Sequence, residues 1–322
     1  MHRIIVSNSM NPYLNIAVEN YLLSHCEEGQ VVMYLWRNDR TVVIGRNQNP
    51  YAECDVERLE SDGGSLMRRG TGGGAVYHDG GNLNFSFIVP YSSYDVGRQL
   101  GVMQQAVATF GLDTEVSGRN DVLCQGRKFS GNAFAKGSKG RLHHGTILIK
   151  TDVQALQRYL IAKPAKLQRH GVASVQSRVV NLSELQPAVT AEGLIPRLVE
   201  AFEQSYGKVE TLNFDSIASL PEVGNLYDKY SSDEWKYGGW REFSAQFSHH
   251  FDWGGVDIAL TVDEPTSTFA KVQIASDSLF PETIARATQL LQGASSVMPP
   301  SIVDEQNPHI LNDIFTLIYE KK

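Results

Sequence analysis

Short apolar runs rich in β-branched and aromatic residues constrain the fold of this chain most. They include VVMYLW (31–36), TVVIGR (41–46), NLNFSFIVP (82–90) and LHHGTILIK (142–150). Runs of this length and composition are typical of strands. Helical patterns are interspersed among them without strict βαβ alternation, which a parallel α/β sheet would require. The sequence therefore predicts an α+β domain built on a mixed or antiparallel sheet that is flanked by helices.

The connections refine this expectation. Four residues, Arg-Asn-Asp-Arg (37–40), separate the first two runs, so 31–36 and 41–46 are predicted to form a hairpin-like pair. Asn11-Pro12 is a helix-start signal, and the apolar residues after it recur at helical spacing. Helices are expected at 14–26 and at about 96–110, 152–161 and 191–205.

A second, smaller unit is expected at the C-terminal end. The chain has 322 residues, which is long for one hydrophobic core. The pattern weakens over 206–250, after which GGVDIALTVD (254–263) and STFAKVQIASD (267–277) predict two paired strands. Two helical segments follow, at 281–293 and 301–322. We therefore expect a catalytic domain over 1–245 and a small α+β accessory domain over 246–322.

The charge is distributed unevenly. The net charge is −7, yet residues 122–183 contain 11 basic residues and one acidic residue, Asp152. The simplest interpretation of such a block is a solvated face. Because apolar strand-like runs interrupt it, we expect it to line something negative. An acidic protein is a poor partner for nucleic acid, so a nucleotide and an acidic protein are the better candidates.

The compartment follows from cysteines and apolar runs. The three cysteines are scattered, which argues against a disulfide framework and against a zinc site. No apolar run approaches the ~20 residues of a membrane span, and MHRIIVSNSM does not resemble a secretion signal. The sequence predicts a cytoplasmic protein that does not act on membranes.

The glycine-rich segment RRGTGGGAVYHD (68–79) carries the first chemical signal. Consecutive glycines let backbone N–H groups approach a ligand closely. Two arginines beside them supply forked donors for phosphate or carboxylate. The segment predicts an anion-binding loop, although the Gly-Lys-Ser/Thr ending of a Walker loop is missing. A plain tight turn with surface arginines is the alternative.

The segment GRNDVLCQGRKFSGNAF (118–134) carries the second signal. A carboxylate and a polyphosphate repel each other, and a lysine ammonium between two such anions screens their repulsion. Lys128 is the candidate for that role. Asp121 is a candidate Mg²⁺ ligand, because this ion takes few carboxylates plus phosphate oxygens, and Asn120 would orient donors beside it. The alternatives are a solvated lysine and an aspartate that caps a turn.

Together these segments resemble the lipoate–protein ligase A family of the biotin/lipoate ligase superfamily. The doubled arginine, three glycines and Ala-Val-aromatic-His-Asp are similar to its signature. The order Asn-Asp, Lys, Gly (120–131), the string His-His-Gly-Thr (143–146) and the segment 166–185 are similar too. The C-terminal unit resembles the accessory domain of the larger bacterial members.

The resemblance implies site residues. For ATP and the adenylate they are Arg69, Gly74, Ala75, Val76, Tyr77, Asn120, Asp121, Lys128 and Arg178. For lipoate they are Arg69, Gly74, His78, Lys128, His144 and Gly145. Val76, Leu83 and Phe85 are expected to help form an apolar slot for the lipoyl chain, and adjacent His143 and His144 to face opposite sides of a strand. Segment 166–185, with Arg178, is expected to cover the adenylate and exclude water.

The resemblance also implies a reaction. Lys128 would be the catalytic residue, and ATP and Mg²⁺ the cofactors, in the conversion of lipoic acid to lipoyl-AMP and pyrophosphate. A lysine of an acceptor then takes the lipoyl group. The acceptors implied are lipoyl domains of 2-oxo-acid dehydrogenases and the glycine-cleavage H protein, whose acidic surfaces would complement the basic block.

Several alternatives stay open. A lipoyltransferase would use preformed lipoyl-AMP, and an adenylate-binding protein would not turn over. A biotin ligase fits less well because its glycine-arginine motif differs. The related octanoyltransferases use a cysteine nucleophile, but Cys124 lies in an apolar Val-Leu-Cys run where a buried small residue is the ordinary outcome. The sequence does not rank lipoate against octanoate.

Overall fold

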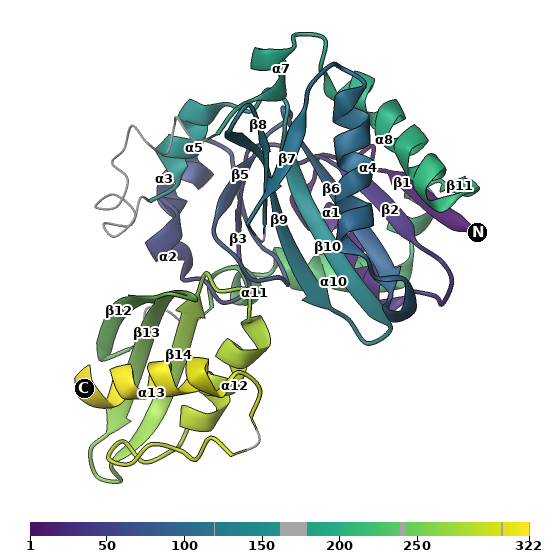
Figure 1. The fold of residues 1–322 in the computed structure, drawn as a ribbon. Coiled ribbons are helices and arrows are strands. Elements are labelled where there is room, and N and C mark those ends of the chain that lie inside the picture. The colour runs from purple at the N-terminus through teal and green to yellow at the C-terminus, as the bar shows by residue number, and fades with distance from the viewer. Residues whose placement is uncertain (119, 162–178, 239–242, 304, 322) are drawn as a thin grey trace.

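The computed structural model describes residues 1–118, 120–161, 179–238, 243–303 and 305–321. An eight-stranded mixed sheet forms the larger part of the molecule (Figure 1). Strands β11, β1 and β2 run parallel to one another, and every other neighbouring pair is antiparallel. In spatial order the strands are β11 (Val209–Leu212), β1 (His2–Val6), β2 (Val32–Trp36), β6 (Asn82–Pro90), β10 (Gly140–Leu148), β9 (Arg127–Lys136), β8 (Asp121–Cys124) and β7 (Thr114–Ser117).

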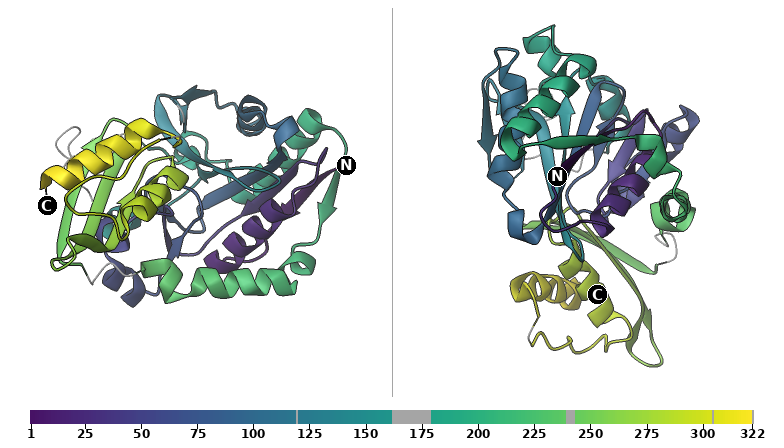
Figure 2. Two further views of the ribbon diagram at one scale, coloured as in Figure 1. Left: turned by 90° about the horizontal axis from the view of Figure 1, so that it is seen from below. Right: turned by 90° about the vertical axis from the view of Figure 1, so that its right-hand side faces the viewer.

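Helices cover both faces of this sheet (Figures 1 and 2). Neighbouring strand residues point to opposite faces, so Ile4 packs into one core and Ile5 into the other. The first core includes helices α4 and α8, and the second includes α1, α9 and α10. These helices are α1 (Pro12–Ser24), α4 (Val96–Ala108), α8 (Ala191–Tyr206), α9 (Phe214–Ala218) and α10 (Pro221–Ser231). The α+β architecture expected from the sequence is confirmed.

The start of α1 follows the predicted signal. The side chain of Asn11 accepts hydrogen bonds from the backbone N–H groups of Tyr13 and Leu14, and Pro12 occupies the first turn, where no N–H is needed. This cap fixes where the helix begins. Ile16 and Glu19 then lie one turn apart on one face of the helix.

The predicted hairpin of 31–36 and 41–46 is wrong. β2 joins the large sheet, whereas β3 (Thr41–Ile44) is the middle strand of a separate sheet with β4 (Ser65–Arg68) and β5 (Val76–His78). Every residue of β2 and of β3 is buried. Strands that are buried on both faces carry no alternation that would specify a partner, so their short connection suggested the wrong pairing.

A second unit with its own core lies at the C-terminal end (Figure 1). Its antiparallel sheet consists of β12 (Ala245–Phe251), β13 (Gly254–Asp263) and β14 (Thr268–Ser276). Helices α12 (Pro281–Leu291) and α13 (Pro308–Lys321) pack against it. The predicted strand pair over 254–277 is confirmed, and the last helix begins later than expected. We call this part the accessory unit.

Among the described residues, three helices begin in the stretch 206–250, where the sequence pattern weakens. No helix in the described part of the chain is long and apolar enough to span a membrane. The other helices that the described residues form are α2 (Pro50–Glu53), α3 (Val56–Ser61), the 3₁₀ turn Tyr91–Ser93, α5 (Val153–Tyr159), α7 (Leu182–Leu185) and α11 (Asp233–Tyr237).

Candidate active site

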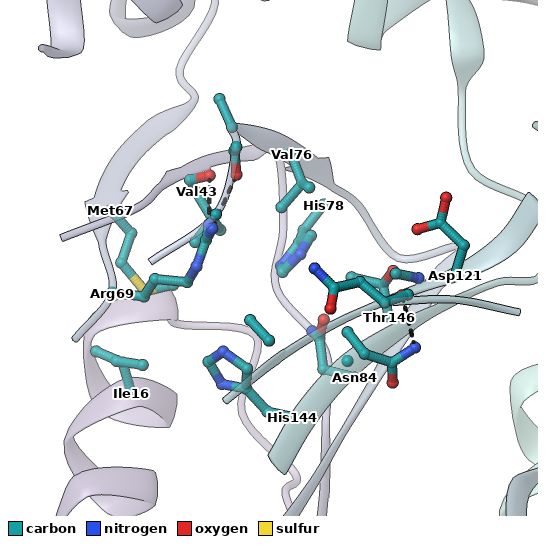
Figure 3. Close-up of a pocket in the computed structure, with 18 of the residues that line it drawn as sticks. Ile16, Val43, Met67, Arg69, Val76, His78, Asn84, Asp121, His144 and Thr146 are labelled. Carbon is teal, nitrogen blue, oxygen red and sulfur yellow. Dashed lines mark hydrogen bonds between the residues drawn. The ribbon is translucent and has the colours of Figure 1, made fainter. Parts of the chain in front are cut away.

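A cavity of about 330 Å³ lies between the large sheet, the small sheet and α1 (Figure 3). Asp121 and Thr146 lie on one side of it, and Arg69, Met67 and Ile16 on the other. The walls combine apolar side chains with a few polar groups, as is usual for small-molecule sites. The lining residues are Ile16, Trp36, Val43, Met67, Arg69, Gly73, Gly74, Ala75, Val76, His78, Asn84, Asn120, Asp121, Lys128, Gly131, Asn132, Ala133, His144, Gly145 and Thr146.

The glycine-rich loop (residues 70–75) is shaped from within by Arg69. This guanidinium is buried and donates to the carbonyl oxygens of Val43, Gly72 and Gly74. Burial lowers the pKa of Arg69 to about 10, and the nearby carboxylate of Glu19 opposes that shift, so the group stays charged at neutral pH. Because loop residues accept most of its N–H donors, Arg69 holds the loop in shape at the edge of the cavity.

Arg68 has a different position although it is adjacent in sequence. Its guanidinium donates to the carbonyl oxygens of Gly45, Arg46 and Gln48, and to those of Trp235 and Lys236. These contacts tie the end of β3 to α11. The first arginine of the pair is therefore a structural clamp outside the cavity.

A chain of buried hydrogen bonds connects the loop to α1. Arg69 Nε donates to Thr71 Oγ1 at 2.9 Å, and that hydroxyl lies 2.9 Å from His144 Nε2. His144 Nδ1 lies 2.8 Å from Glu19 Oε1, which also accepts from Ser86 Oγ. Because a carboxylate only accepts hydrogen bonds, His144 donates through Nδ1. Helix α1 thus helps to hold the glycine-rich loop through two side chains.

A lysine and a carboxylate meet at the other side of the cavity. Lys128 Nζ lies 2.7 Å from Asp121 Oδ1, and both side chains remain partly exposed. The pairing of β8 with β9 shifts register between Val122 and Leu123, and such a bulge re-aims a side chain. A Cβ atom at Gly131 would lie 3.1 Å from Lys128 Nζ. A glycine at this position therefore leaves room for the ammonium group.

Asn120, which precedes Asp121, is held in place by Asn132, and Asn132 is in turn held by His143. Asn132 donates through its backbone N–H and its side chain to the carbonyl oxygen of Asn120. Asn132 Oδ1 lies 2.9 Å from His143 Nε2, whose ring also contacts Gln99 on α4. Burial, and secondarily the charge of His144, lower the pKa of His143 to about 3. The neutral His143 is therefore a structural residue, and the two adjacent histidines face opposite sides of β10 as predicted.

The donor set fits Mg²⁺ only when phosphates supply further ligands. Asp121 is a carboxylate at the cavity, and Asn120 Oδ1 is a buried acceptor without a hydrogen-bond partner in the described part of the chain. The described residues include no cluster of three metal-ligating side chains. Mg²⁺ usually takes one or two carboxylates and completes its shell with water and phosphate oxygens. Asp121 and Asn120 could therefore hold an ion that a nucleotide brings.

Most of the predicted site residues meet in this one cavity. Tyr77 does not line it, because β5 alternates and turns that ring away to pack beside Tyr159. Arg178 and most of segment 166–185 lie outside the described residues. The predicted residues that line the cavity are Arg69, Gly74, Ala75, Val76, His78, Asn120, Asp121, Lys128, His144 and Gly145.

The apolar wall differs from the expected one. Val76 lines the cavity, but Leu83 and Phe85 are buried in the core on the α4 face of the sheet. The wall comes instead from Ile16 on α1, Trp36 at the end of β2, and Val43 and Met67 on the small sheet. The alternation of β6 could have identified Asn84 as a residue on the cavity side. Ile16 and Met67 carry no local signal of this kind.

The accessory unit touches the glycine-rich loop directly. Gly73 N–H donates to the carbonyl oxygen of Ser278 at 3.1 Å. A Cβ atom at Gly72 would lie 2.2 Å from the same oxygen, whereas a Cβ atom at Gly74 would meet nothing within 4 Å. Gly72 is therefore required for the close approach of the two backbones.

Replacing Gly72 by alanine should separate this contact, because the carbonyl of Ser278 belongs to the backbone and cannot rotate away. We expect the free energy of unfolding to fall by about 1–3 kcal/mol, as for other overpacked sites. Urea titration would measure it. Gly74→Ala is the matched control and should change stability by less than about 0.5 kcal/mol. Equal losses in the two variants would contradict the role assigned to Gly72.

Cys124 is placed as a core residue. It lies in the core under α4, is 1% exposed, and does not line the cavity. Burial raises the pKa of its thiol, and the nearby Asp113 carboxylate adds to the shift, so the reactive thiolate is disfavoured.

We expect Cys124→Ala to keep acyl transfer to an acceptor domain within about threefold of the parent rate, the size of a minor repacking effect. Loss of transfer in a folded variant would indicate a nucleophilic cysteine.

The fold and the site define a class of protein. A partly apolar cavity ends at a lysine and a carboxylate, beside a glycine-rich loop suited to phosphate, which is the arrangement of an acid-activating ligase. Comparison with known families makes the class specific. Residues 11–203 match the lipoyl protein ligase A/B catalytic domain, and residues 241–301 match the bacterial lipoate protein ligase C-terminus. The chain belongs to the lipoyl protein ligase A/B family.

Individual relatives agree with this assignment. The lipoate-protein ligase A of Bdellovibrio bacteriovorus is 39% identical over 298 residues, which are 90% of this chain and 87% of the relative. Among solved structures, P. falciparum LipL1 in complex with lipoate is 26% identical, with a TM-score of 0.84 over the whole of both chains.

Two further structures cover the larger part of the chain. A lipoate-protein ligase A bound with ATP is 27% identical, with a TM-score of 0.60 over 74% of this chain and 98% of its own. A bi-partite lipoate protein ligase from Thermoplasma acidophilum, described with its E2 lipoyl domain, is also 27% identical. Its TM-score is 0.65, over 76% of this chain and 99% of its own.

Proposed function

We propose that the chain is an ATP-dependent lipoate–protein ligase that works in two steps. A carboxylate oxygen of lipoate attacks the α-phosphorus of ATP, the bond to the β-phosphate breaks, and lipoyl-AMP and pyrophosphate form. The ε-amine of an acceptor lysine then attacks the acyl carbon, the bond to AMP breaks, and the amine loses a proton. The observation that carries the proposal is Lys128, which meets Asp121 at the cavity beside the glycine-rich loop.

The residues of the chain divide this chemistry among them. Lys128 would lie between the lipoate carboxylate and the α-phosphate and stabilise the charge that develops there. Gly74, Ala75 and Val76 line the cavity, and the absence of a side chain at Gly74 would let a nucleotide approach the backbone closely there. Ile16, Val43 and Met67 would take the apolar chain of the acid. Mg²⁺ would neutralise phosphate charge when bound, with Asp121 and Asn120 beside it.

The acceptor is proposed from chemistry and from the relatives. One related structure is described together with an E2 lipoyl domain, which supports a lipoyl domain as the protein substrate. The glycine-cleavage H protein is a second proposed acceptor, implied by the family resemblance. Exposed basic side chains on the β9–β10 hairpin, at Lys136, Lys139 and Arg141, would favour an acidic partner.

The proposal also covers the domain boundaries and the cellular compartment. We place the catalytic domain at 1–245 and the accessory domain at 246–322; β12, the first strand of the accessory sheet, begins at Ala245. We also propose that the enzyme works in the cytoplasm. Its cysteines Cys26, Cys54 and Cys124 are all free and buried, which suits a reducing compartment.

The test is lipoate-dependent exchange of labelled pyrophosphate into ATP, with Mg²⁺ and without an acceptor protein. Exchange would establish acid activation. Transfer from supplied lipoyl-AMP to a lipoyl domain, without exchange, would instead indicate a lipoyltransferase. Binding of lipoyl-AMP with neither activity would indicate an adenylate-binding protein.

A further inference from the structure

His78 presents an unused hydrogen-bond donor to the cavity. It lies at the end of β5, is 3% exposed, and lines the cavity between the side of Asp121 and the side of Ile16 and Met67 (Figure 3). Its Nε2 atom has no hydrogen-bond partner among the described residues. A buried polar atom without a partner is rare and points to a ligand group or water that would satisfy it.

The structure determines which nitrogen of His78 carries the proton. Asn15 Nδ2 lies 3.0 Å and 2.8 Å from the carbonyl oxygens of Ser9 and Arg37 and 3.1 Å from Asn38 Oδ1, so its two N–H groups are shared among three acceptors and Asn38 presents its oxygen to them. Asn38 must therefore turn its NH₂ group toward His78, and its Nδ2 lies 3.2 Å from His78 Nδ1. Nδ1 accepts this bond, so the proton of the neutral ring is on Nε2.

The ring remains neutral at any physiological pH. Burial, followed by the charges of Arg69 and His144, lowers the pKa of His78 to about 3. Asn84, which also lines the cavity and is 1% exposed, has an unpartnered side-chain Nδ2 as well. His78 and Asn84 therefore contribute two uncharged N–H donors without partners to the lining of the cavity.

We propose that His78 Nε2–H donates to a ring sulfur of the dithiolane and thereby selects lipoate over acids of the same shape that lack sulfur. This inference rests on the proposed function, which places the carboxylate of the acid at Lys128. The acyl chain would then run from Lys128 into the cavity and end with its ring beside His78 and Asn84, against the apolar side chains of Ile16 and Met67, which line the same cavity (Figure 3).

The selection works through the cost of leaving a donor unpaired. A purely hydrocarbon end would pack beside His78 and leave Nε2–H without an acceptor. A disulfide sulfur is a weak acceptor, yet it restores a partner at that point. Sites that hydrogen-bond a substrate group discriminate against analogues that lack it more strongly than apolar pockets discriminate by size.

The experiment compares lipoate with its carbocyclic analogue, in which CH₂ groups replace both ring sulfurs. The readout is the ratio of kcat/KM for the two acids in acid-dependent pyrophosphate exchange. We expect the wild type to prefer lipoate by about tenfold, which corresponds to ~1.4 kcal/mol. His78→Met and His78→Gln are matched in length, and only the glutamine retains an N–H donor. The preference should fall toward one in His78→Met and persist in His78→Gln.

Each outcome decides the matter. A wild-type preference near one overturns the inference without any variant, as does a His78→Met ratio equal to that of the wild type. Thermal unfolding and ATP binding of both variants show whether they are folded. Exchange with neither acid in the wild type would contradict the proposed function itself. Exchange with both acids at equal efficiency would contradict only the role of His78.

Discussion

Replacement of Lys128 by alanine is expected to lower lipoate-dependent pyrophosphate exchange by about 10²–10³-fold, the usual cost of removing one group that stabilises developing charge. The ammonium lies at the cavity, 2.7 Å from Asp121, and its position depends on the space above Gly131. Without it, the carboxylate of the acid and the phosphates of ATP repel each other unscreened. Most of the loss should appear in kcat, since the charge develops in the transition state.

The controls separate charge from folding. Lys136→Ala removes a lysine from the same strand, where the side chain is exposed and lies over the ring of Tyr91. It should keep exchange within about twofold, as surface substitutions do. Lys128→Arg retains the charge but spreads it over a planar fork, so we expect an intermediate rate. Full exchange in a folded Lys128→Ala variant would contradict the assignment.

The chemistry of the site was more predictable from the sequence than its walls. Lys128 and Asp121 lie in one short segment of the sequence. They meet because β8 and β9 are adjacent strands joined by a tight turn. The glycine-rich loop is likewise a local feature, because its consecutive glycines predict a backbone that can approach a ligand. The structure adds that Arg69 donates hydrogen bonds to the carbonyl oxygens of this loop, which no spacing in the sequence reveals.

The walls depend on long-range packing. Ile16, Trp36 and Met67 come from α1, the large sheet and the small sheet, and only the tertiary fold brings them together. The pairing of β3 was missed for a related reason, since its uniformly buried residues fit either sheet. Local patterns specify the type of an element well, but partner choice is set by non-local contacts.

Replacement of Glu19 by alanine is expected to destabilise the fold by about 3–5 kcal/mol, the cost of leaving a buried charge without its partner. Glu19 is 1% exposed, accepts from His144 and Ser86, and lies near the buried charge of Arg69. Its loss leaves the buried positive charge of Arg69 without its nearby carboxylate, surrounded only by neutral carbonyl and hydroxyl oxygens. Urea titration of the free energy of unfolding would measure the effect.

Glu27→Ala is the matched control, since this glutamate is exposed just after α1 and should cost less than about 0.5 kcal/mol. Glu19→Gln retains an acceptor for His144 but removes the charge, so its loss should be intermediate. A Glu19→Ala variant as stable as the control would show that the buried charge of Arg69 is balanced elsewhere. If the expected loss is found, α1 supports the glycine-rich loop through His144 and Thr71, and KM for ATP should rise more in Glu19→Gln than in Glu27→Ala.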